Sequence, residues 1–116
     1  MDAADKKRIL YELGDIPESV YDELVVILID ETLKQVVKIN EAINGSRPDE
    51  ILRIVHSIKG SAGNLRIARI QEAAKAIETE IKEMLKSEGG MRDTLKFAGL
   101  LEDMKAAAEK ERKERA

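Results

Sequence analysis

Apolar side chains recur every three or four residues through most of this chain, which is the spacing of one face of an α-helix. Glycines interrupt the pattern at Gly14, Gly45 and Gly89-Gly90, where helices are expected to end. The pattern therefore predicts a short helix over 3–13, a long helix over 18–44, a third over 48–64, a fourth from 67 to the glycine pair, and a last helix from Met91.

Long amphipathic helices joined by short connections normally pack as antiparallel neighbours. We therefore predict an all-α fold, an up-and-down antiparallel four-helix bundle with an additional short N-terminal helix. Residues 1–116 are expected to form a single domain, with the N-terminal helix at 1–14 and the bundle at 18–108. The charged tail at 109–116, EKERKERA, has nothing large to bury, so we expect it to fray or remain solvated.

The long helix carries a second apolar row, formed by Val26, Ile29, Leu33 and Val37. One buried face does not require this row, so another surface must cover it. The N-terminal helix lying across the row is one interpretation, and a partly exposed docking surface for a partner protein is the other.

Composition excludes several classes of function. Charged residues make up 37% of the chain with a net charge of −3, so a general basic surface for nucleic acid is not expected. The absence of cysteine excludes disulfides and thiolate metal sites. No segment approaches the ~18 apolar residues of a membrane span, and the N-terminus has no apolar run. We expect a soluble, cytoplasmic monomer.

The single histidine, His56, lies in the third predicted helix. On a helical wheel Ile54, Ile58 and Leu65 fall opposite His56, so the ring is expected to point into solvent. Lys59, Gly60 and Gly63 fall on the same outward face, one or two turns further along.

Glycine inside a helix costs ~1 kcal/mol relative to alanine, so stability alone does not explain two glycines beside an exposed histidine. Without their side chains, another protein can approach the imidazole closely. A neutral imidazole nitrogen is a nucleophile suited to in-line attack on a phosphoryl group. The ammonium of Lys59, one turn away, would offset the arriving negative charge.

A lone histidine is more often an ordinary residue than a functional one, but its grouping with Lys59 and the two glycines favours function. Arg53 either extends a local positive patch or is a solvated surface charge. A carboxylate-bridged metal site needs inward-facing Glu-x-x-His pairs from more than one helix, whereas this chain has one histidine, so no metal site is expected.

At these residues the sequence resembles the histidine-containing phosphotransfer (HPt) family, whose signature is H-x-x-K-G followed by small residues. HSIKGSAGN fits it from His56 to Asn64, and the similarity extends from Tyr21 to Glu78. In one departure, many relatives follow Asn-Leu with glycine where this chain has Arg66. We expect Asn64 to supply the left-handed reversal of the turn instead.

The resemblance implies that His56 is the phosphoacceptor and that Lys59 contacts the phosphoryl group. Glu78, on the following helix, occupies the position of a polar residue that orients the ring; an ordinary exposed acid is the alternative. The surface for partner docking is expected to comprise Gly60, Gly63, Arg53, Ser57 and Leu52.

The resemblance also implies that the partners are response-regulator receiver domains and an upstream histidine kinase. The receiver domain would supply Mg²⁺, so no cofactor is expected on this chain. The chain has no glycine-rich phosphate loop or kinase motif, so we expect a phosphoryl carrier and not an enzyme. Two alternatives stay open, a phosphoacceptor domain excised from a chemotaxis-type or hybrid histidine kinase, and a helical interaction scaffold without phosphotransfer.

Overall fold

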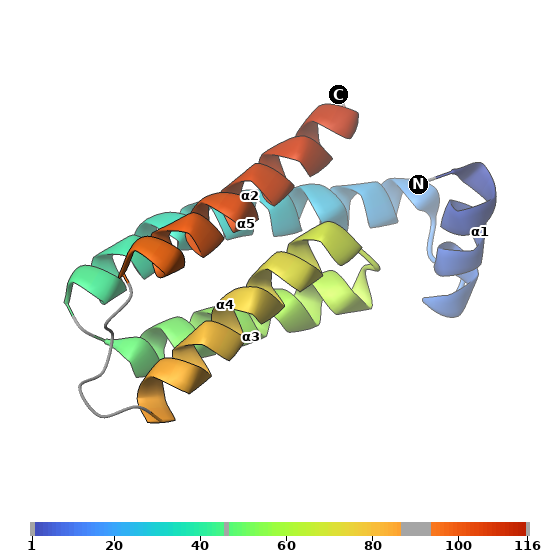
Figure 1. Cartoon of the computed structure of the whole chain (residues 1–116). Helices are drawn as coiled ribbons and strands as arrows, with labels where there is room; N and C mark the ends of the chain where they lie inside the picture. The colour runs from blue at the N-terminus through green and yellow to red at the C-terminus, as the bar shows by residue number, and fades with distance from the viewer. Residues whose placement is uncertain (1, 46, 87–93, 116) are drawn as a thin grey trace.

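The computed structural model describes residues 2–45, 47–86 and 94–115. Over these residues every regular element is a helix (Figure 1). The helices are α1 (Ala3–Glu12), α2 (Glu18–Asn44), α3 (Pro48–Asn64), α4 (Ala68–Lys86) and α5 (Thr94–Glu114). The predicted all-α class is confirmed. The predicted helix end at Gly89-Gly90 and the helix start at Met91 lie outside the described residues.

Four of the helices form a closed bundle, since α2 and α4 each pack against both α3 and α5. Figure 1 shows these helices side by side in alternating directions. The core between them is mainly aliphatic, because the chain has few aromatic residues. Its largest fully buried side chains include Tyr21, Phe97, Ile29, Ile39, Ile51, Ile70, Ile77, Ile81 and Met104.

The N-terminal helix α1 lies beyond the N-terminal end of α2 (Figure 1). Ile9 is buried there, and the Lys6 ammonium lies 2.9 Å from a Glu18 oxygen and 2.7 Å from an Asp22 oxygen. The prediction that this helix covers the second apolar row of α2 is therefore wrong. Helix α5 packs along α2, where Leu33 and Val37 line a groove together with Leu101. The row is only partly covered, since Ile29 is buried but Val26 and Val37 are 47% and 59% exposed.

The C-terminal helix α5 extends to Glu114, so the predicted fraying is wrong for residues 109–114, although all of them except Glu111 are exposed, as the other alternative had it. Glu111 is buried, and its two carboxylate oxygens lie 2.8 Å from Arg69 and 2.7 Å from Arg115. Charge pairing, and not apolar burial, thus attaches this end of α5 to the start of α4. Apolar spacing does not reveal such pairs, because they join charged side chains of different helices.

The turn between α3 and α4 fixes how these two helices meet. The Ile67 amide donates to the Ala62 carbonyl (2.9 Å) and the Arg66 amide donates to the Gly63 carbonyl (3.2 Å), a Schellman motif. Arg66 takes the left-handed conformation, with a φ of 61°, so the prediction that Asn64 supplies the reversal is wrong. The buried Tyr21 also donates its hydroxyl to the Leu65 carbonyl at 2.5 Å, which ties the turn to α2.

Candidate functional site

Helix α3 places the histidine ring outside the bundle. The His56 side chain is 72% exposed, which confirms its predicted direction. The core face differs slightly from the predicted one, because Val55 is fully buried whereas Ile54 is only half-buried. Helix α3 is thus rotated slightly about its axis relative to the predicted wheel. Lys59 therefore faces α4, and its side chain is 28% exposed.

The ring and the lysine meet at one buried carboxylate on α4. His56 Nδ1 lies 2.9 Å from Glu78 Oε2, and the Lys59 ammonium donates to Glu78 Oε1 at 2.6 Å. Glu78 is only 5% exposed, so it is not the exposed helix acid of the alternative interpretation. The ammonium of Lys82, one turn further along α4, lies 3.7 Å from Oε1.

The cations around Glu78 keep its carboxylate ionised. The hydrogen bond from Lys59 is the main cause that lowers the pKa of Glu78 from 4.5 to about 2, and the hydrogen bond from His56 adds to it. Burial acts in the opposite direction, because it disfavours the charged form. The carboxylate is therefore charged throughout the neutral pH range.

An ionised carboxylate can only accept hydrogen bonds, so it selects the tautomer of the ring. Nδ1 of His56 carries the hydrogen that Glu78 accepts, and in the neutral ring Nε2 then holds a free lone pair. The arrangement thus presents one nucleophilic nitrogen on an exposed ring, with its orientation fixed from the protein side.

The two glycines of α3 have different surroundings. A Cβ added at Gly60 would meet nothing within 4 Å, so the surface beside His56 is open there. A Cβ added at Gly63 would lie 2.8 Å from the side-chain nitrogen of Gln71 on α4. Gly63 therefore permits close packing of α3 against α4, and the prediction that it only keeps the surface open is incomplete.

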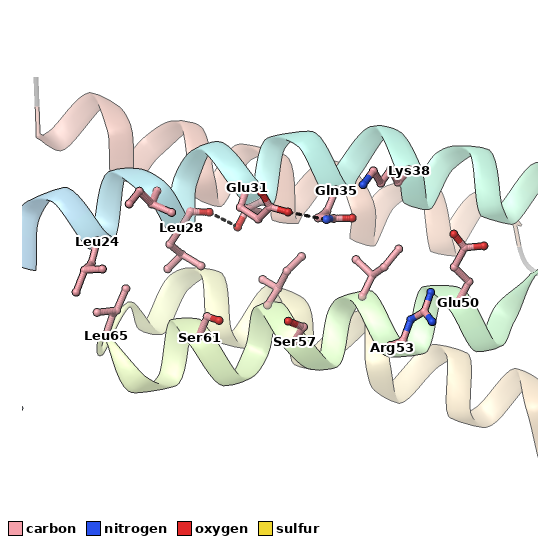
Figure 2. Close-up of a pocket in the computed structure, with 14 residues that line it drawn as sticks. Leu24, Leu28, Glu31, Gln35, Lys38, Glu50, Arg53, Ser57, Ser61 and Leu65 are labelled. Atoms are coloured by element: carbon pink, nitrogen blue, oxygen red, sulfur yellow. Dashed lines mark hydrogen bonds between the residues drawn. The ribbon is translucent and has the colours of Figure 1, made fainter.

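The other predicted docking residues lie on two sides of the histidine. Arg53 and Ser57 line a groove of about 580 Å³ between α2 and α3 (Figure 2). Leu52 is half-buried and packs against the core. Arg53, Ser57 and Gly60 are exposed, whereas Leu52 is only partly so.

Figure 2 shows that the opposite wall of this groove comes from α2, which sequence analysis did not include in the site. Leu24 and Ile27 line the groove and are 40% and 57% exposed. They follow Val20, which is 41% exposed, at steps of four and three residues. That spacing was visible in the sequence, but on a helix with so many apolar residues it did not distinguish an exposed row from a buried one.

Lys82 was also missed, although it shares a helix face with Glu78 at a spacing of four residues. Among the described residues no group of three or more histidine, cysteine, aspartate or glutamate side chains is arranged to hold a metal ion. No helix in the described part of the chain has the length and apolarity needed to cross a bilayer.

Comparison with known families matches residues 23–111 to the Hpt domain family. The matched region begins within α2 and ends in α5, and it includes the cluster of His56, Lys59 and Glu78. Helix α1 lies outside it. Comparisons with curated proteins and with solved structures give no match.

Proposed function

The chain belongs to the Hpt domain family, whose members carry phosphoryl groups in two-component signalling, and we propose that His56 is the residue that carries the group here. In this proposal the phosphoryl group moves to or from an aspartate of a response-regulator receiver domain. The observation that supports it best is the exposed ring of His56 with Nδ1 held by a buried, ionised carboxylate.

The transfer is an in-line displacement at phosphorus. The lone pair on Nε2 of His56 forms the N–P bond, while the acyl O–P bond of the receiver's aspartyl phosphate breaks and leaves its electron pair on the carboxylate oxygen. The ring becomes positively charged because Nδ1 keeps its hydrogen. Glu78, 2.9 Å from Nδ1, stabilises that charge as it develops.

Lys59 supplies positive charge for the phosphoryl oxygens. It lies one turn from His56 on the same helix, so its flexible side chain can reach a group bound to Nε2. We expect the receiver domain to contribute the magnesium ion, so that this chain needs only its ring, its ammonium group and its carboxylate.

The surface around His56 suits a receiver domain. The exposed side chains of Val20, Leu24 and Ile27 provide an apolar area on α2, and Arg53 adds a positive charge at the groove between α2 and α3. At Gly60 nothing would obstruct an approaching loop, which matters because the two reacting groups must come into contact.

The proposal is tested by incubating the protein with receiver domains charged by acetyl phosphate, and separately with phosphoramidate. We expect an acid-labile, alkali-stable phosphate on His56, and no uptake by H56Q. The variant should keep its helix content and remain folded, because an exposed side chain carries little packing energy. Absence of uptake by the unmodified protein from phosphoramidate and from several receivers would contradict the proposal.

A further inference from the structure

We propose that Lys82 replaces Lys59 at Glu78 Oε1 when Lys59 turns to the phosphoryl group on His56. Lys82 is then a positioning residue that keeps a counter-ion on the buried carboxylate throughout the transfer. This inference rests on the proposed function, since it describes the state of the same site after phosphorylation.

The geometry creates a conflict that Lys82 can resolve. The Lys59 ammonium donates to Glu78 Oε1 at 2.6 Å, whereas the phosphoryl oxygens would be attached on the far side of the ring, at Nε2. A lysine ammonium cannot hold both positions at full hydrogen-bond strength. If Lys59 moves to the phosphoryl group, Oε1 loses the closest cation that it has among the described residues.

Loss of that cation would be costly because Glu78 is almost completely buried. The carboxylate would then keep only the ring Nδ1–H on Oε2, and a buried carboxylate that loses a cation takes up a proton more readily. A protonated Glu78 could no longer stabilise the positive charge on the phosphorylated ring. The function of Glu78 in the transfer therefore requires a second cation within reach.

Lys82 meets this requirement. It lies four residues after Glu78 on α4, its side chain is 56% exposed, and its ammonium is 3.7 Å from Oε1. At that separation Lys82 attracts the carboxylate, but it is too far away for a good hydrogen bond. A small rotation of an exposed side chain would close this gap once Lys59 has left.

Other charged groups do not compete for this role in the described part of the structure. From α3, His56 and Lys59 face Glu78, and from its own helix only Lys82 pairs with it. On α5, Lys96 lies 2.9 Å from Glu80. Lys82 already lowers the pKa of Glu78, as its proximity requires.

The exchange can be tested without phosphate, because removing Lys59 imitates its departure. The pKa of Glu78 is measured by ¹³C NMR of its carboxyl group in the unmodified protein, K82M, K59M and the double variant. We expect K82M to raise this pKa slightly when Lys59 is present and by about one unit when Lys59 is absent. An equal rise in both backgrounds would overturn the inference. K59Q serves the same comparison should K59M unfold.

Phosphate uptake from phosphoramidate supplies the second measurement. We expect K82M to take up phosphate about threefold more slowly, K82R to match the unmodified protein, and K86M to show no change. Lys86 is a suitable control because it is an exposed lysine two turns from Glu78 on the same helix. If K82M takes up phosphate at the normal rate, the inference about Lys82 fails but the proposed function stands. If the unmodified protein takes up no phosphate, the proposed function fails as well.

Discussion

Two buried glutamates of this bundle bind cations in contrasting ways. Glu78 and Glu111 are 5% and 8% exposed. Glu111 is held between the guanidinium groups of Arg69 and Arg115, at 2.8 and 2.7 Å. Glu78 instead contacts an exposed histidine and two lysines at 2.9, 2.6 and 3.7 Å.

The difference separates a structural use of a buried carboxylate from a chemical one. The rigid, planar guanidinium of arginine suits a permanent contact, and the Arg69–Glu111 pair connects the start of α4 to the end of α5. A lysine ammonium is a point charge on a flexible stem, so it can leave one anion for another. The partners of Glu78 are thus able to rearrange, and one of them is a nucleophile.

The largest expected effect concerns phosphate uptake by E78Q and E111Q. Glutamine at position 78 removes the negative charge that compensates the ring as the N–P bond forms. We therefore expect uptake from phosphoramidate to fall about 10- to 100-fold in E78Q, as is typical when a group that orients a reactive histidine is lost. E111Q should take up phosphate at the normal rate.

E111Q is the matched control because it also removes a buried carboxylate. We expect it to lower the free energy of unfolding by about 1 to 3 kcal/mol, since Arg115 loses this carboxylate and Arg69 keeps only its contact with Glu114. If uptake fell equally in both variants, lost stability and not local chemistry would explain E78Q, and the contrast between the two glutamates would fail.

Much of this architecture follows from the sequence, and the family resemblance already pairs Glu78 with His56, but the other partners of the buried acids do not follow from it. Apolar spacing and glycine positions predict the helices, and the outward direction of His56 follows from the wheel of α3. The Arg69–Glu111 pair joins residues far apart in the sequence, so no local pattern reveals it. The cluster around Glu78 is equally hard to predict. Lys82 and Lys59 approach the same oxygen of Glu78, but Lys59 comes from α3, so only the packing of α3 against α4 shows that the two lysines share it.

A smaller effect is expected from filling the open surface at Gly60. A leucine there should slow transfer from a receiver domain about tenfold by steric blocking, but leave uptake from the small donor phosphoramidate nearly unchanged. Gly99 on α5 is the matched control, because a Cβ there also meets nothing within 4 Å. G99L should transfer normally.

Both glycine substitutions should also stabilise their helices by about 0.5 to 1 kcal/mol, because each replaces a flexible residue at an uncrowded position. Urea unfolding measures this change. Equal rates of transfer from the receiver domain in G60L and the unmodified protein would show that the partner does not approach over Gly60, and the docking surface would have to lie elsewhere.

The last expected effect is the dependence of stability on acid. The pKa of Glu78 is lowered to about 2 in the folded protein by its cations, and an unfolded glutamate titrates near 4.5. The stabilisation is therefore fully present above about pH 4.5 and is lost as the pH falls toward 2. Between pH 7 and pH 3 the unmodified protein should lose about 2 kcal/mol more than E78Q, which has no carboxylate at this position to protonate. Urea unfolding of both proteins at the two pH values measures the difference, and an equal loss in both would mean that the lysines and the histidine do not hold Glu78 in its charged form.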